Sequence, residues 1–508
     1  MIIANPNEKK LLLSVCFLIL IGYSFVLKAP FKTMDDQAAI VQNDAIKNFA
    51  NLPGLFQRGF FNEDRTYYRP LVSVGIMVQY HFFKLNPFFY YLCSILLHIL
   101  NTAAVYLLSA HLIQNRRYAF LIALAFGIHP IQWESVSNIA DQAILLCAFF
   151  YLNSFLCFCL FQERKKNIFY AASVCLFFLA LLCKEEAATL PILLFVYFMT
   201  IKKEARINFI ARFSGLLPFF IALALYLALR MNAGITQAFY WPSRQEAFLG
   251  FMTFLRGLLT YLRLFVFPVD LHFDRARPLF VNILNAEFIL TLMFFLTGAV
   301  LLWRLRKAIS AEFWFFFFWF LFLLLPVSQI FYGVGMQPGF ISLAEHFLYL
   351  PSAGFFAGAV LLAGKFLKGI EKRGFISSPV IKAALSAYFL FLFSFLVKQN
   401  IYASSEMAMF QQSLFYNPYN VDIQRALGMI YVGRGRLKEA EECFRAALNV
   451  HPYSVPVRIA LGKVLCDQGR FREGMQEYEK IADPGEHGKL LENNKRLTLE
   501  ILKKESGK

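Results

Sequence analysis

Residues 138–162 read NIADQAILLCAFFYLNSFLCFCLFQ, and Asp141 is the only charged residue among them. The chain becomes basic directly afterwards, at Arg164, Lys165 and Lys166. A helix needs about 20 mainly apolar residues to cross roughly 30 Å of hydrocarbon. This stretch is therefore long and apolar enough to span a membrane, and the basic residues after it are typical of a cytoplasmic helix end.

The composition extends this interpretation to most of the chain. Of the 508 residues, 58% are hydrophobic and 16% are charged, whereas soluble domains carry about 25% charged residues. We expect about eleven spans by the length criterion for a membrane helix, near residues 11–28, 88–112, 117–131, 138–162, 167–183, 187–201, 211–230, 286–304, 312–332, 346–364 and 379–400. The sequence thus predicts an all-α polytopic membrane protein, with a membrane domain over residues 1–400.

Basic residues mark alternate loops between these spans. They precede the first span and follow the second, fourth, sixth, eighth and tenth: Lys9, Lys10, Arg116, Arg117, Arg164, Lys165, Lys166, Lys202, Lys203, Arg206, Arg304, Arg306, Lys307, Lys365, Lys368, Lys372 and Arg373. Lys and Arg near helix ends stay on the cytoplasmic side. We therefore expect a cytoplasmic N-terminus, an uncleaved first span and a C-terminal tail on the outer side of the membrane. The net charge of +17 then reflects topology and attraction to anionic lipid, and no nucleic-acid partner is predicted.

The tail, residues 401–508, contains a repeat with a 34-residue offset. Pairs of residues recur at this offset: Asn417-Pro418 as His451-Pro452, Leu427-Gly428 as Leu461-Gly462, and Gly435-Arg436 as Gly469-Arg470. This is the tetratricopeptide (TPR) period. The sequence predicts a short TPR domain in which small residues let paired helices approach closely, namely Gly428, Ala440, Gly462 and Gly474. An ordinary helical bundle is the alternative.

Cysteines give little functional information. Seven of the nine fall in expected spans, where a free thiol behaves as a small hydrophobic group. Cys443 and Cys466 lie in the tail and either pair or remain two free thiols in a helical core. No metal-ligand spacing is present.

The first outer loop, residues 29–87, carries polar residues directly beside the membrane. Asp35 and Asp36 follow the first span, and Arg69 precedes Pro70. Apolar residues predict short helices over 38–49 and 71–83, of a kind that lies in the membrane interface. The acids either face solvent or meet a substrate at the surface, and Arg69 is either an interface anchor or a phosphate ligand.

A series of short motifs occurs along nearly the whole chain: Asp35-Asp36, Tyr68-Arg69-Pro70-Leu71, His98 with Asn101, His129-Pro130 with Glu134, Ala140-Asp141, Lys184-Glu185, Phe267-Pro268 with Leu271 and Asp274, and Glu345-His346-Phe347-Leu348-Tyr349-Leu350-Pro351-Ser352. In this order they resemble the transmembrane and tetratricopeptide repeat-containing O-mannosyltransferases and their bacterial relatives. These belong to the GT-C superfamily of glycosyltransferases, which use lipid-linked sugars. Ile139 and His346 depart from the resemblance, because the family usually has arginine at both positions.

The resemblance implies a GT-C fold and transfer of a sugar, a hexose such as mannose, from a polyprenyl-phosphate donor to a hydroxyl of an extracytoplasmic protein. Asp35 matches the catalytic base and Asp36 its acidic neighbour, and a carboxylate suits the removal of a hydroxyl proton. No metal and no cofactor beyond the donor substrate are expected. The expected partners are membrane lipids, the donor, and a protein or peptide acceptor that the TPR tail contacts.

Other polar residues are assigned to the donor phosphate or to substrate orientation. Arg69, Arg256, Arg263 and Lys184 are candidates for the lipid phosphate, and the orienting candidates are His129, Glu134, Asp141, Glu185, Glu345 and His346. Arg256 and Arg263 share one face of an apolar helix in an outer segment, and the alternative is that they face water. A helix cap is the alternative for His129, and an ion pair for Lys184 with Glu186.

Three alternatives to protein glycosylation stay open. Within the same superfamily, the acceptor is a lipid or a cell-envelope glycan. A transporter should carry ionisable residues and broken helices near the bilayer midplane, whereas the notable charges here collect at one surface. A scaffold that only displays repeats has no need for Asp35, Arg69, Glu134 and Glu345 together.

Overall fold

The computed structural model describes residues 6–61, 67–202, 214–235, 243–280, 285–330, 340–373 and 377–506. Lys203 and Arg206 of the predicted basic loops lie outside these ranges. The described residues are mostly helical, and their only strands, β1 (Ala276–Pro278) and β2 (Phe340–Ser342), pair in one small sheet. The chain forms two compact units: Met1–Leu271 with Arg277–Ser404, and His272–Ala276 with Ser405–Lys508.

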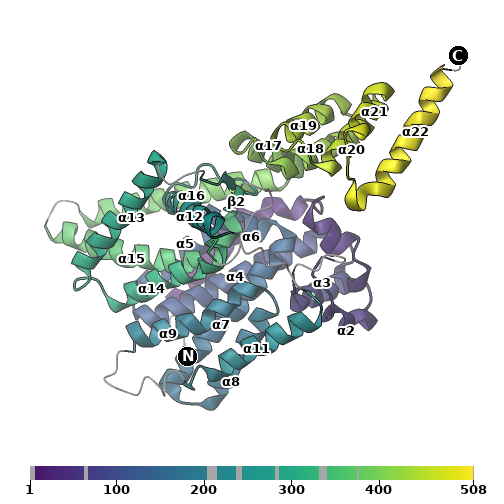
Figure 1. Cartoon of the computed structure of the whole chain (residues 1–508). Helices are drawn as coiled ribbons and strands as arrows, with labels where there is room; N and C mark the ends of the chain where they lie inside the picture. Colours follow the sequence, from purple (N-terminus) through teal and green to yellow (C-terminus); the bar gives the residue numbers. More distant parts are fainter. Residues whose placement is uncertain are drawn as a thin grey trace. The chain divides into compact units, whose positions relative to one another are not determined.

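The first unit contains a helix at each expected span (Figure 1). These helices are α1 (Pro6–Tyr23), α4 (Pro87–Ile113), α5 (Arg116–Ile128), α7 (Gln142–Arg164), α8 (Asn167–Leu181), α9 (Leu190–Thr200), α11 (Leu217–Asn232), α13 (Ala286–Leu305), α14 (Ala311–Leu323), α15 (Tyr349–Lys372) and α16 (Ser378–Ala403). The polytopic all-α prediction is confirmed.

Fewer of the described helices than expected spans meet the length criterion for a membrane helix. Seven described helices are long and apolar enough to cross a membrane, or eight if the bent pair formed by α5 and Pro130–Ser137 is one span. One of the seven is α12 (Arg244–Val266), which the sequence analysis placed in an outer segment. Helices α8, α11 and α14 are shorter. The count of about eleven therefore stays a prediction.

Buried polar side chains join the long helices of this unit. His98 of α4 contacts the hydroxyl of Tyr349 through Nδ1 (2.8 Å) and the carbonyl of Gly127 through Nε2 (3.0 Å). Asn101, one turn further along α4, donates to the same hydroxyl (3.1 Å). These contacts connect α4, α5 and α15. They give His98 and Asn101, two residues of the motif series, a role in joining helices.

The first outer loop is a series of short helical segments: η2 (Gln37–Val41), η3 (Asp44–Ile46), η4 (Phe49–Asn51), α2 (Leu52–Leu55) and α3 (Pro70–Phe83). The last of these matches the predicted helix over 71–83. The predicted helix over 38–49 is broken instead. The side chains of Asn43 and Asn48 accept hydrogen bonds from Ala45 and Ala50, and such caps start a new helical turn.

The second unit is the predicted repeat domain. It contains α17 (Glu406–Tyr416), α18 (Val421–Gly433), α19 (Leu437–Val450), α20 (Val455–Asp467), α21 (Phe471–Glu479) and α22 (Gly488–Ser506). Helices α18 and α19 pair, and α20 and α21 repeat the pair 34 residues later. Gly435 and Gly469 take positive φ angles of 71° and 81° in the equivalent turns. Cys443 and Cys466 are free thiols.

Candidate active site

The connection between α5 and α7 carries several polar residues of the site. It consists of η5 (Pro130–Gln132), α6 (Trp133–Ser137) and η6 (Ile139–Asp141). His129 caps η5, because its Nδ1 accepts the N–H of Ile131 (3.1 Å), while its Nε2 contacts the carbonyl of Phe265 (3.1 Å). Both ring nitrogens thus bind backbone atoms, which favours the cap over a substrate-orienting role for this histidine.

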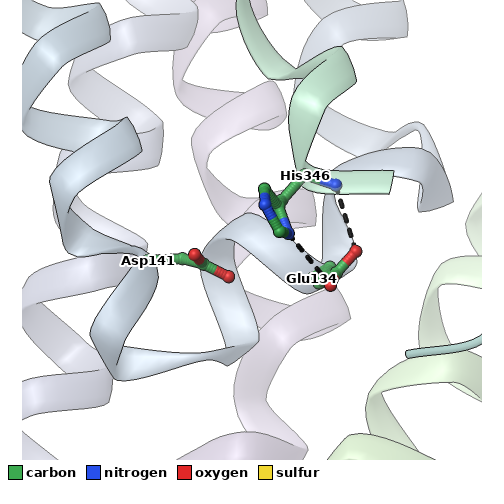
Figure 2. A group of neighbouring side chains, drawn as sticks. All are labelled: Glu134, Asp141 and His346. Carbon is green, nitrogen blue, oxygen red and sulfur yellow. Dashed lines mark hydrogen bonds and ion pairs between the residues drawn. The ribbon is translucent and has the colours of Figure 1, made fainter. Parts of the chain in front are cut away.

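Glu134 of α6 is held against the segment before α15, η9 (Glu345–Leu348). Its Oε1 lies 3.0 Å from His346 Nδ1, and its Oε2 accepts the backbone N–H of His346 at 3.0 Å. Asp141 lies beside this pair, and Figure 2 shows its carboxylate directed toward His346. Glu345 turns elsewhere, since its Oε2 accepts the indole N–H of Trp133 (2.6 Å).

The connection between α8 and α9 adds two ion pairs. Lys184 Nζ lies 3.2 Å from Glu186 Oε2, which is the alternative given above for this lysine. Arg69 Nη2 donates to Glu185 Oε1 at 3.1 Å. Burial by itself raises the pKa of Glu185, but the charges of Arg69 and Lys184, with hydrogen bonds, outweigh it and lower the pKa to about 2. Glu185 is therefore ionised at any physiological pH.

The two acids of the first loop occupy different environments. Asp36 is fully buried and its Oδ2 accepts the backbone N–H of Lys32 at 2.8 Å, whereas Asp35 is partly exposed. Burial raises the pKa of Asp36 to about 7, although the N–H and the charge of Lys32 act in the opposite direction. Lys32 Nζ donates to the carbonyl of Ser137 at 2.7 Å and so joins the loop to α6.

Two predicted phosphate ligands lie elsewhere. Arg256 pairs with Glu287 (3.2 Å) and donates to the carbonyl of Pro278 (2.6 Å), while Arg263 pairs with Asp270 (2.7 Å). These contacts join α12 to α13, to β1 and to the segment directly after α12, and none of them joins the residues around Glu134.

Four segments that are distant in sequence therefore meet at one site. The first loop contacts α6 through Lys32 and η7 (Glu185–Thr189) through Arg69, while α6 contacts η9 through Glu134. Lys184 lies 5.9 Å from the ring centre of Phe347 in η9. Lys32 was not predicted as a site residue. The only feature that could have indicated it is the position of its positive charge, four residues before Asp36.

Asn138 and Trp133 were also missed. Asn138 Nδ2 donates to Asp141 Oδ2 at 3.0 Å, and Trp133 binds Glu345. Both lie within the α5–α7 connection that carries Glu134. Their closeness in sequence to Glu134 and Asp141 could have indicated them as site residues. A neutral amide and an indole, however, carry no charge that distinguishes them from other polar residues.

Comparison with known proteins places these features in context. The family profile described as tetratricopeptide repeat matches residues 421–464. A protein O-mannosyl-transferase of Caenorhabditis elegans is 25% identical over 466 residues, which is 87% of this chain and 64% of the relative. The human protein O-mannosyl-transferase TMTC3 is 24% identical over 81% of this chain and 52% of its own length, and the Drosophila melanogaster Tmtc3 is 23% identical over 82% and 52%.

The chain thus spans between about half and two thirds of the length of these relatives. The resemblance drawn from the motifs is confirmed at this level. Over more than four fifths of its length, the chain is similar to animal proteins named protein O-mannosyl-transferases, and its tail contains a tetratricopeptide repeat.

Proposed function

We propose that this chain is a membrane glycosyltransferase of the GT-C type. It moves a hexose such as mannose from a polyprenyl-phosphate donor to a Ser or Thr hydroxyl of an extracytoplasmic protein. The observation that carries the proposal is that the loop of Asp35 and Asp36 contacts α6 through Lys32 and η7 through Arg69, while α6 contacts η9 through Glu134 and His346. The similarity to proteins named O-mannosyl-transferases supports the reaction class.

Asp35 is the proposed base. Its partly exposed carboxylate is the more accessible of the pair, because Asp36 is buried against Lys32. The acceptor hydroxyl gives its proton to Asp35 while the hydroxyl oxygen forms a bond to C1 of the sugar. The bond from C1 to the phosphate oxygen breaks, and polyprenyl phosphate leaves with the electron pair. A positioned base of this kind contributes about 10²- to 10⁴-fold in rate.

Arg69 is the proposed ligand of the leaving phosphate. One guanidinium nitrogen is bound to Glu185, while Nε is buried without a hydrogen-bond partner among the described residues. Such a donor, with Lys184 in the same site, suits the charge that develops on phosphate oxygen in the transition state. Asp141, Glu185 and His346 are the proposed orienting residues.

The proposed setting is a bacterial inner membrane, with the N-terminus in the cytoplasm and the site and tail in the periplasm. The TPR tail is the proposed contact for the acceptor polypeptide, because repeat domains present extended binding surfaces.

The test compares Asp35→Asn with Asp44→Asn in membranes supplied with a labelled polyprenyl-phosphate hexose. Asp44 is an acid of the same loop whose side chain is 89% exposed, so it controls for loss of any loop carboxylate. We expect about a 10²-fold or greater loss for Asp35→Asn and wild-type transfer for Asp44→Asn. Undiminished transfer by Asp35→Asn would sink the base assignment.

The acceptor is read by mass spectrometry of surface proteins and glycolipids from a deletion strain. Loss of hexose from Ser or Thr of surface proteins is the expected result. Loss from a glycolipid or envelope glycan instead would assign the other acceptor class, and no change in either would contradict the transferase proposal.

A further inference from the structure

Glu134 holds the imidazole of His346 in one orientation. Glu134 is 1% exposed, and both of its carboxylate oxygens bind His346, one at Nδ1 and one at the backbone N–H. With the Nδ1 proton donated to Glu134, the Nε2 atom keeps its lone pair. A histidine fixed through one nitrogen by a carboxylate is the usual arrangement of a metal ligand.

Asp141 supplies a second ligand group beside this imidazole. Its Oδ2 accepts from Asn138 Nδ2 at 3.0 Å, which fixes the carboxylate. Ligand atoms of Glu134, Asp141 and His346 all lie within 4.8 Å of one another. Figure 2 shows Asp141 approaching His346 from a different element than Glu134 does.

The distribution of charge around this group independently points to a cation. Glu185 is paired with Arg69 and Glu186 with Lys184, whereas Glu134 accepts from an imidazole that is neutral when Nε2 of His346 keeps its lone pair. The described hydrogen-bond partner of Asp141 is the neutral amide of Asn138. These two ion pairs therefore leave the carboxylates of Glu134 and Asp141 without a full counter-charge of their own, and a bound divalent cation would supply it beside Arg69 and Lys184.

We infer that His346 and Asp141 bind a divalent metal ion, and that Glu134 is the positioning residue that orients the imidazole. A ligand set of one imidazole nitrogen and one carboxylate oxygen is open to Mn²⁺ and similar ions. Such ions commonly take their remaining ligands from water and substrate phosphate. The role in binding donor phosphate rests on the proposed function, whereas the metal site itself does not. It replaces the metal-free expectation from the sequence.

The experiment titrates Mn²⁺ into the purified full-length chain in lipid nanodiscs and follows free Mn²⁺ by electron paramagnetic resonance. We expect saturable binding by the wild type. Asp141→Asn and Glu134→Gln should weaken it by about 10- to 100-fold, the range for loss of an orienting partner, or by more for the direct ligand. Asp44→Asn should bind as the wild type does.

His346→Arg separates a ligand from a structural ion pair. Arginine can still donate hydrogen bonds to Glu134 but offers no lone pair to a metal, so thermal stability should stay near that of the wild type while Mn²⁺ binding is lost. Wild-type binding by both His346→Arg and Asp141→Asn, or no saturable binding by the wild type, would overturn the site. Mn²⁺ binding is measured without a sugar donor. A failure of the metal site can therefore be told apart from a failure of the proposed transferase activity.

Discussion

At the scale of single residues, Asp36 and Glu185 show opposite consequences of burying a carboxylate. Burial dominates at Asp36 and raises its pKa from 3.8 to about 7. At Glu185 the charges of Arg69 and Lys184 overcome burial and lower its pKa to about 2. The two residues should therefore respond differently to pH, since a pKa that differs between folded and unfolded states makes stability depend on pH.

Asp36→Asn should stabilise the chain most at alkaline pH. Because the folded-state pKa lies above the unfolded value, the stability contributed by Asp36 is fully present below about pH 4 and is lost as pH rises through about 7. The amide oxygen of Asn still accepts the N–H of Lys32 but never ionises. We expect the unfolding temperature of Asp36→Asn in detergent to exceed that of the wild type by more at pH 8 than at pH 5. An equal difference at the two pH values would contradict the assigned pKa.

Glu185→Gln should destabilise the chain to a similar extent at those two pH values. The side chains of Arg69 and Glu185 are 13% and 31% exposed, and removal of one partner from a largely buried ion pair costs about 3 kcal/mol. The folded-state pKa is depressed, so this stability is present above about pH 4 and is lost only as pH falls through about 2. A loss confined to one of the two pH values, measured by the same thermal unfolding, would argue against the pairing.

At the scale of elements, close helix packing in the repeats depends on glycine. A Cβ added at Gly428 would lie 2.5 Å from Cε1 of Phe444, and one at Gly462 would overlap the ring of Tyr478. These positions are equivalent in the two repeats, and each aromatic ring belongs to the paired helix. Gly433 at the end of α18 has nothing within 4 Å of an added Cβ.

Gly462→Ala should therefore loosen the repeats while Gly433→Ala should not. Overpacking a close contact costs about 1–3 kcal/mol, whereas alanine at an open helical site gains up to about 1 kcal/mol. Proteolysis of the full chain by trypsin is the measurement, with faster cleavage after Lys and Arg of α20 and α21 expected for Gly462→Ala alone. Equal cleavage rates for both variants would show that the close approach is not needed.

At the scale of the whole molecule, the alternation of basic loops predicts that the tail and the loop after α7 lie on opposite sides of the membrane. Tyr453 in the tail is 87% exposed, and Arg164 at the end of α7 is also exposed. Tyr453→Cys should react with a membrane-impermeant maleimide in intact cells. Arg164→Cys should react only after permeabilisation, and the reverse pattern would invert the topology.

The local sequence predicted the long apolar helices and the repeats, but not the break in the expected helix over 38–49. The apolar stretch over residues 138–162 covers all but the last two residues of α7, and the 34-residue offset predicted equivalent turns at Gly435 and Gly469. Apolar length and repeat period can both be read from the sequence without knowledge of distant contacts. A helix satisfies its backbone hydrogen bonds within its own segment, so the segment alone predicts it. The apolar length of helix α12 also fits a span, so its assignment to an outer segment stays a prediction.

The sequence did not predict most of the contacts between charged residues of the site. The sequence singled out Arg69, Glu134, Glu185 and His346 but did not predict which of them pair. The pairs are 116 residues apart for Arg69 and Glu185 and 212 for Glu134 and His346, and the contact of Lys32 with Ser137 spans 105. An ion pair forms where packed helices bring two side chains within a few ångströms, and no periodicity of the chain records that distance. Local periodicity therefore determines the helices and repeats, while tertiary packing decides which acids are paired with a cation and raises the pKa of buried Asp36 to about 7.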